Sequence, residues 1–132
     1  MYNKNQNAYY RKAYKENPEK YRAINRASYQ RNKAARDLRA KNYQKQARID
    51  CINHYSHGTN ACACCGVTGI VFLTLDHING DGAKLRRDGV HKTGTMFAIW
   101  LRKNGYPEGI QVLCHNCNQA KRQLPNCPHL TT

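Results

Sequence analysis

Hydrophobic residues are spread unevenly along this chain. The first fifty residues contain only three large aliphatic residues after the initial methionine, and Tyr, Ala and charged or amide side chains fill most other positions. A segment so poor in aliphatic residues cannot build a core of its own. Apolar runs separated by Gly and Pro appear in the second half of the chain. The pattern therefore predicts a helical extension over residues 1–57 and a folded domain over residues 58–132.

The extension has the composition of a helical segment. It is rich in Ala, Arg, Lys and Gln, which favour helix, and its tyrosines form a loose repeat. Asn17, Pro18 and Glu19 have the chemistry of a helix start, namely a capping amide, a first-turn proline and a first-turn acid. Asn32 is a candidate cap for a further helix. We predict helices at roughly 5–16, 18–31 and 33–56, separated by short breaks.

Two strands and two helices are predicted in the folded domain. The runs "GIVFLTL" (69–75) and "GIQVLC" (109–114) are rich in apolar and β-branched residues, which is typical of strands. The stretch "TMFAIWLRKNG" (95–105) has the spacing of a short amphipathic helix. A second helix is predicted to begin with "NQAKR" at Asn118. This mixture of elements indicates a small α+β domain.

The charge of the chain favours a polyanionic partner. The formal net charge is +14, and fourteen of the 22 Lys and Arg residues lie in the first fifty positions. A field of this sign attracts nucleic acid first and an anionic membrane surface second. No apolar run approaches the length of a membrane span, and the N-terminus lacks the apolar region of a secretory signal. We therefore expect no membrane partner and a reducing, cytoplasmic location.

Two interpretations of the extension remain open. Its helices could lie along nucleic-acid phosphates, with tyrosines packing or contacting the backbone. It could also be a solvated basic helix, or a segment that stays disordered until a partner binds. The candidate phosphate contacts in the extension are Arg11, Lys12, Arg22, Arg26, Arg31, Arg36 and Arg39.

Four of the seven cysteines form two C-x-x-C pairs. Cys62 and Cys65 lie in "CACCG", and Cys114 and Cys117 lie in "CHNC". This spacing lets two thiolates converge on one ion, and two such pairs are typical of a closed tetrahedral zinc site. In a small domain, the ion would supply much of the folding free energy.

Two neighbouring residues compete for this ligand set. Cys64 could replace a member of the first pair, and His115 could replace a member of the second. We favour the four C-x-x-C cysteines, which leave no open coordination position, so the predicted zinc is structural. Cys51 and Cys127 lie outside both pairs and are expected to be free thiols.

The acidic, glycine-rich stretch "LDHINGDGAKLRR" (75–87) invites comparison with a calcium loop. Such a loop needs oxygen ligands at its first, third and fifth positions, glycine at the sixth and an acid at the twelfth. Counting from Asp76, the third position is Ile78, the sixth is Asp81 and the twelfth is Arg87. The register therefore excludes a calcium loop of this type.

A different combination of residues could carry chemistry. Asp76 and His77 end the first predicted strand, and Asn118 directly follows Cys117. If zinc joins the two C-x-x-C turns, the strand end and the helix start are brought close together. Asp76 and Asn118 could then share a hard divalent cation, and His77 could take a proton from water near neutral pH.

The order of these motifs resembles the HNH (ββα-metal) endonucleases over about residues 60–123. Among them, the phage recombination endonucleases of the endonuclease VII type are similar in their four-cysteine zinc, their metal-binding Asp before His and their Asn after the last zinc cysteine. The resemblance implies a single-metal DNA endonuclease with Mg²⁺ or Mn²⁺ on Asp76 and Asn118. It also implies that His77 is the general base and that the products carry 5′-phosphate ends. A phage or bacterial host cell is the implied setting.

The chain departs from the family pattern in two places. The position of the usual middle Asn is occupied by Gly109, so the residue that orients His77 is not assigned, and Asn79 and Asn116 are the candidates. The stretch between the two motifs is also long, and the predicted helix at 95–105 lies in it as an apparent insertion.

The expected partner is double-stranded DNA, with linear and branched forms both open. A cut through both strands would require two active sites and hence a homodimer. The alternative function is a non-catalytic zinc ribbon that binds nucleic acid through its basic extension, and an RNA-cleaving or RNA-guided nuclease also remains open. In the folded domain, the candidate DNA contacts are Lys84, Arg86, Arg87, Lys121 and Arg122.

Overall fold

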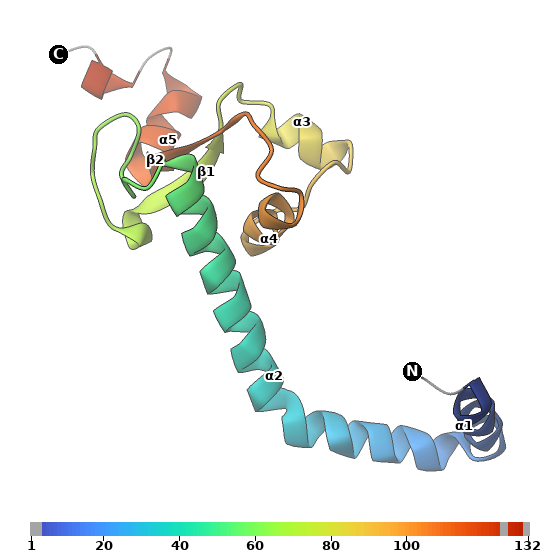
Figure 1. The fold of residues 1–132 in the computed structure, drawn as a ribbon. Helices are drawn as coiled ribbons and strands as arrows, with labels where there is room; N and C mark the ends of the chain where they lie inside the picture. The colour runs from blue at the N-terminus through green and yellow to red at the C-terminus, as the bar shows by residue number, and fades with distance from the viewer. Residues whose placement is uncertain (1–3, 125–126, 131–132) are drawn as a thin grey trace. The chain divides into compact units, whose positions relative to one another are not determined.

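The computed structural model describes residues 4–124 and 127–130 (Figure 1). It combines helices with one two-stranded antiparallel sheet, which agrees with a small α+β domain. In chain order, the elements are α1 (Lys4–Glu16), α2 (Pro18–Tyr55), the 3₁₀ turn η1 (Ile70–Phe72), β1 (Leu73–His77), α3 (Gly82–Arg87), α4 (Thr95–Lys103), β2 (Ile110–Cys114), α5 (His115–Gln123) and the 3₁₀ turn η2 (Pro128–Leu130).

The chain forms two compact units, Met1–Lys41 and Asn42–Thr132. The boundary between them lies inside α2, whereas the sequence pattern placed it between residues 57 and 58. The last turns of α2 belong to the second unit because Ala47, Cys51 and Ile52 are fully buried there. The alanine and cysteine carry little apolar surface, so this buried face gave a weak signal in the sequence.

The first unit is a helical segment with no buried residue among positions 6–41. Its helices carry local ion pairs, such as the 2.8 Å contact between Lys33 Nζ and Asp37 Oδ2. The predicted break at Asn32 is wrong, because the Asn32 side-chain amide donates to the Ser28 carbonyl one turn earlier at 2.9 Å. The two helices predicted at 18–31 and 33–56 are therefore one continuous helix, α2.

The sheet of the second unit pairs β1 with β2 in antiparallel register. Leu73 lies opposite Cys114, and His77 lies opposite Ile110. The first strand begins later than predicted, because residues 70–72 form a 3₁₀ turn, and it continues through Asp76 and His77. The two site residues are therefore held by strand pairing.

The core of the second unit consists of two adjoining clusters. One surrounds Ile52, Leu73 and Val112 and includes the sulfur-bearing residues near the sheet. The other packs the end of α2 against α4 through Phe97 and Leu101. The helix predicted at 95–105 is confirmed as α4, although it ends at Lys103.

Helix α2 is also tied to the sheet by a polar contact. The Arg48 guanidinium donates hydrogen bonds to the Ile70 and Leu73 carbonyls, at the point where the 3₁₀ turn enters β1. Tyr55, in the last turn of α2, donates its hydroxyl hydrogen to the Pro107 carbonyl at 2.7 Å.

Within residues 4–124 and 127–130, no helix has the combination of length and apolar character that crossing a membrane requires.

Candidate functional site

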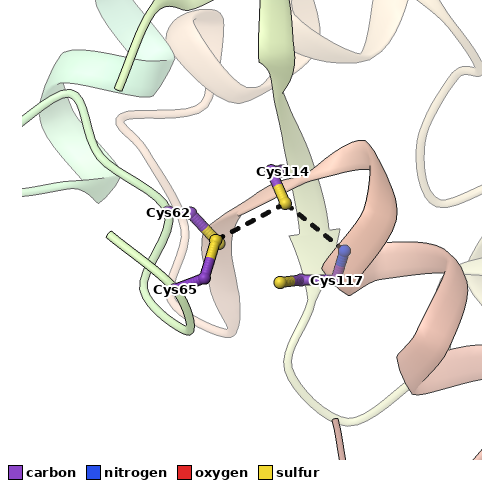
Figure 2. A group of neighbouring side chains, drawn as sticks. All are labelled: Cys62, Cys65, Cys114 and Cys117. Atoms are coloured by element: carbon purple, nitrogen blue, oxygen red, sulfur yellow. Dashed lines mark hydrogen bonds between the residues drawn. The ribbon is translucent and has the colours of Figure 1, made fainter. Parts of the chain in front are cut away.

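Four cysteine side chains converge between β2, the first turn of α5 and the loop after α2 (Figure 2). The sulfur atoms of Cys62, Cys65, Cys114 and Cys117 all lie within 4.8 Å of one another. The sulfurs of Cys65 and Cys114 are 3.7 Å apart. Zinc–sulfur bonds of about 2.3 Å in a tetrahedron place the sulfurs about 3.8 Å apart. The predicted convergence of the two pairs is confirmed, and the cluster could hold a metal ion such as zinc.

Backbone hydrogen bonds shape the loop that carries the first pair. The Cys62 N–H donates to the Val67 carbonyl at 2.9 Å, and the Gly66 N–H donates to the Cys62 carbonyl at 2.9 Å. Gly66 has a φ of 74°, a left-handed conformation that glycine adopts without strain. The Ala63 N–H donates to the Val112 carbonyl at 2.8 Å, which fixes this loop beside β2.

The second pair is positioned by the junction of β2 and α5. Cys114 is both the last residue of β2 and the N-cap of α5. Its sulfur accepts a hydrogen bond from the Cys117 N–H at 3.4 Å (Figure 2). A sulfur that caps a helix points toward the N–H groups of the first turn, and these favour a negatively charged thiolate.

The protonation of the cluster is set by burial and by backbone donors. Burial acts to raise the pKa of Cys62, but backbone N–H groups, led by that of Cys65, outweigh it and the pKa falls to about 6. The pKa of Cys117 is raised, chiefly by burial. Not all of the thiols can ionise together without a cation, so metal binding would be linked to proton release.

Three further side chains gather around Cys117. Cys64, Cys127 and His129 offer ligand atoms that lie, with the Cys117 sulfur, within 4.8 Å of one another. Cys127 was expected to be a free thiol without a role as a ligand, and its position in this second cluster changes that interpretation. Cys51 is a buried thiol that donates to the Ala98 carbonyl, and burial raises its pKa to about 11.

A surface pocket of about 490 Å³ lies at the end of β1. It is lined by Asp76 and His77 from the strand and by Asn118 from α5. The structure therefore brings together the three residues that the sequence singled out for chemistry. The cationic side chains that line the same pocket are Arg86, Lys121 and Arg122. Lys84 and Arg87 do not line it, and Lys84 is 3.7 Å from Asp88 on an exposed face of α3.

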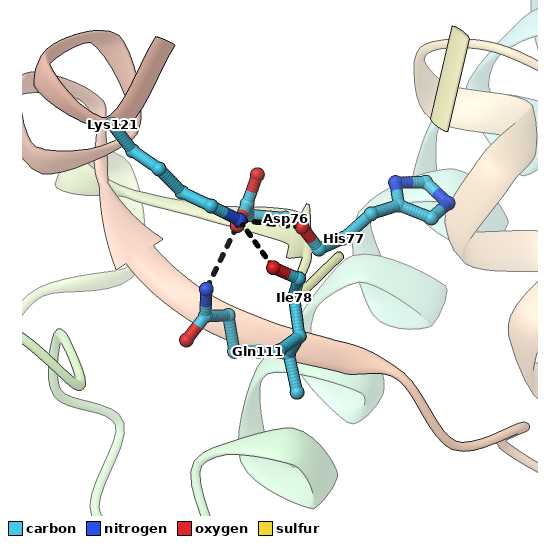
Figure 3. Close-up of polar contacts among 5 residues, drawn as sticks. All are labelled: Asp76, His77, Ile78, Gln111 and Lys121. Atoms are coloured by element: carbon cyan, nitrogen blue, oxygen red, sulfur yellow. Dashed lines mark hydrogen bonds and ion pairs between the residues drawn. The ribbon is translucent and has the colours of Figure 1, made fainter. Parts of the chain in front are cut away.

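The Asp76 carboxylate is held by two neighbours (Figure 3). Lys121 Nζ lies 2.6 Å from Asp76 Oδ2, and the Gln111 amide donates to the same oxygen at 2.9 Å. Lys121 also donates to the carbonyls of His77 at 2.6 Å and Ile78 at 3.0 Å. The sequence had suggested that Lys121 binds phosphate, whereas this structure places its ammonium on the carboxylate and the strand end.

His77 lies on the other side of the strand from Asp76, as successive strand residues do, and Figure 3 shows its ring pointing away from the carboxylate. The ring stacks on Phe97, with centroids 5.1 Å apart. Its Nε2 atom is 3.0 Å from Nε2 of His91. Burial, followed by the charge of His91, lowers the pKa of His77, so its neutral form persists to lower pH than in an exposed histidine.

His91 fixes which nitrogen of His77 carries the proton. His91 Nδ1 lies 2.9 Å from the Lys92 carbonyl, and a carbonyl can only accept, so Nδ1 is the donor. In neutral His91, Nε2 is then the acceptor, and His77 must donate from its own Nε2. The remaining nitrogen of neutral His77, Nδ1, carries the lone pair that can accept a proton.

His91 is thus the orienting residue that the sequence did not identify. Among residues 4–124 and 127–130, no hydrogen bond joins the two predicted candidates, Asn79 and Asn116, to the His77 ring. His91 is buried at 6 % exposure. It lies fourteen positions after His77 in a loop without a recognisable motif. The spacing of residues in the sequence therefore did not indicate that His91 is buried among Phe97 and Trp100.

Gly82, the first residue of α3, is fitted against the His77 ring. A Cβ atom at this position would lie 2.6 Å from His77 Nδ1 and 2.9 Å from Cε1. Such a contact is closer than van der Waals packing allows, so the ring or the helix would have to shift. Glycine is therefore needed here for space.

The predicted contacts in the extension all have exposed side chains on α1 or α2. Arg22 pairs with Glu19 at 2.8 Å, and the Arg36 guanidinium lies 4.8 Å from the centre of the Tyr29 ring. The residues of this set are Arg11, Lys12, Arg22, Arg26, Arg31, Arg36 and Arg39. Their exposure leaves them accessible to a polyanion.

The chain matches no protein-family model, no curated protein and no solved structure. The resemblance to the HNH endonucleases accordingly rests on the C-x-x-C pairs, on Asp76 and His77 at the strand end and on Asn118.

Proposed function

We propose that this protein is a metal-dependent endonuclease that hydrolyses DNA phosphodiester bonds. The observation that carries the proposal is the pocket shared by Asp76, His77 and Asn118. A carboxylate, an amide and a neutral imidazole supply two kinds of metal ligand and a base, and the cationic side chains around them suit a phosphate. The high positive charge of the chain supports a nucleic-acid substrate.

The donor set at the pocket fits a hard divalent cation. Asp76 and Asn118 offer carboxylate and amide oxygens, which Mg²⁺ and Mn²⁺ prefer. Gln111 and Lys121 both contact the Oδ2 atom of Asp76, so neither of them occupies the other carboxylate oxygen. When bound, the ion would stabilise the charge that develops on the phosphate and on the departing 3′ oxygen. Lys121 competes with the cation for this carboxylate and would have to turn from it toward the phosphate.

His77 is the proposed general base. Its neutral form, favoured by burial, would remove a proton from the attacking water at Nδ1. The bond from His77 Nε2 to His91 would hold the ring in position. Arg86 and Arg122 would bind the phosphates on either side of the bond that is cut.

The first prediction is that His77→Ala abolishes Mg²⁺-dependent nicking of supercoiled plasmid DNA. The variant loses the base but keeps the cysteine cluster, so its zinc content and its helical circular dichroism should match those of the wild type. His57→Asn is the matched control, because His57 is an exposed histidine with a positive φ that Asn tolerates. Nicking at the wild-type rate by the His77→Ala protein would contradict the mechanism.

A second candidate function is a zinc-containing module that binds nucleic acid without cutting it. It is favoured by the 2.6 Å contact between Lys121 and Asp76, which satisfies the carboxylate without a divalent cation. A plasmid assay with Mg²⁺ or Mn²⁺ against EDTA, run together with a binding assay on the same DNA and on RNA, separates the two. Binding without metal-dependent cleavage would support the second function.

A further inference from the structure

We propose that the chain binds two zinc ions in one binuclear centre, with the Cys117 thiolate bridging them. The first ion would take Cys62, Cys65 and Cys114 as its other ligands. The second would take a set outside the two C-x-x-C pairs, namely Cys64, Cys127 and His129. The two groups share Cys117, and the ligand atoms of each group lie within 4.8 Å of one another.

The distances in the second group are close to those of a metal site, and slightly shorter. His129 Nδ1 lies 3.2 Å from the Cys117 sulfur and 3.4 Å from the Cys127 sulfur. Tetrahedral zinc with bonds of about 2.3 Å to sulfur and about 2.0–2.1 Å to nitrogen places these atoms about 3.6 Å apart. All of the cysteines in the group are free thiols rather than disulfides. Three cysteines and one histidine are a regular ligand set for a closed zinc site.

Cys117 is suited to the bridging position. It is the most buried of the clustered cysteines, with 1 % of its surface exposed, and it lies in the first turn of α5 between the two groups. A thiolate has enough lone pairs to bind two ions. The second ion brings two further thiolates and a neutral imidazole, so the binuclear centre carries the same net negative charge as one zinc on four cysteines.

The second ion would also explain how the end of the chain is held. Cys127 is buried at 8 % exposure, although it lies next to η2, a turn of only three residues. Cys127 packs in the sulfur-rich cluster beside Val112 and Cys114. A metal bond from Cys127 and His129 to the Cys64 loop would fix η2 against α5.

The direct test is the metal content of the full-length protein after exhaustive dialysis. We expect two zinc ions per chain in the wild type, and one in the double variant Cys127→Ser with His129→Ala. Cys64→Ser gives an independent second variant at the opposite end of the site. Cys51→Ala is the control, since its thiol contacts the Ala98 carbonyl and lies in neither group. One zinc per chain in the wild type would overturn the proposal, as would two that persist in both variants.

Cobalt substitution tests the bridge itself. Two high-spin Co²⁺ ions that share one thiolate couple magnetically, whereas two ions in separate sites do not. The electron paramagnetic resonance signal should therefore grow up to one equivalent of Co²⁺ and decrease toward the second. In the double variant it should grow and then stay constant. A wild-type signal that doubles between one and two equivalents would overturn the shared thiolate. Neither measurement depends on nuclease activity.

Discussion

At the scale of single residues, the candidate site depends on contacts that hold one imidazole ring. His77 stacks on Phe97, donates to His91 and lies against Gly82. A ring held on three sides has little freedom to turn, which is the requirement for a base that must meet a water molecule in a fixed position. Changes to its neighbours should therefore affect catalysis before they affect the fold.

Gly82→Ala should reduce the cleavage rate by about 10²-fold, because a methyl group would displace the His77 ring by a fraction of an ångström or more. Zinc content should not change. Gly89→Asn is the matched control, since Gly89 has a positive φ and open space around its Cα, and Asn tolerates that conformation. Plasmid-nicking rates of the two variants give the comparison, and equal rates would show that the close approach to the ring is unimportant.

The pH dependence of cleavage should reflect the lowered pKa of His77. The neutral base is needed, so activity should persist below pH 6.5, the ordinary pKa of histidine, and then fall as the ring is protonated.

His91→Gln keeps an acceptor but removes the charge of His91. The fall in activity on acidification should therefore move to higher pH, while most activity remains. His91→Phe keeps the packing but removes the acceptor, and it should lower the rate about 10-fold or more. If activity falls at the same acidic pH in the wild type, in His91→Gln and in His91→Phe, the result would argue against His77 as the base.

At the scale of elements, the sequence predicted α4, β2 and the two C-x-x-C turns, because each has a strong local signal. It missed α3, which is six residues long and follows a glycine-rich turn. It divided α2, because the Asn32 amide has the chemistry of a cap and only the structure shows it bonded within the helix. It placed His91 and Cys127 outside any site, because neither lies in a motif whose spacing shows its partners.

Arg48 illustrates how an element can be fixed by one side chain. Arg48→Met keeps the aliphatic stem but removes the donors to the Ile70 and Leu73 carbonyls. We expect the free energy of unfolding of the second unit to fall by about 2–3 kcal/mol, because charge-assisted bonds to half-buried acceptors are lost. Urea denaturation followed by Trp100 fluorescence measures this. Arg39→Met, an exposed arginine on the same helix, should change it by about 0.5 kcal/mol or less.

At the scale of the whole molecule, loss of metal should unfold the second unit, because that unit contains both cysteine clusters. A structural zinc site contributes about 10–16 kcal/mol, which is as large as the stability of an ordinary domain. A chelator should therefore unfold the second unit and move the Trp100 emission to longer wavelength, and added Zn²⁺ should restore it. Chelator saturated with zinc beforehand is the control. Unchanged emission in the metal-free protein would show that the hydrophobic clusters alone hold the unit together.

The register of β1 and β2 limits how this domain can change over evolution. Cys114 and His77 mark opposite ends of the five-residue pairing, so the sheet sets the spacing between the cysteine cluster and His77 at roughly 13 Å. An insertion or deletion of one residue in either strand would turn Asp76 or Cys114 to the wrong face. The connecting segments at 88–94 and 104–109 are less constrained in length, although they must place His91 beside His77 and Pro107 beside Tyr55. Relatives of this chain should therefore differ in length in those segments and keep both strands at five residues.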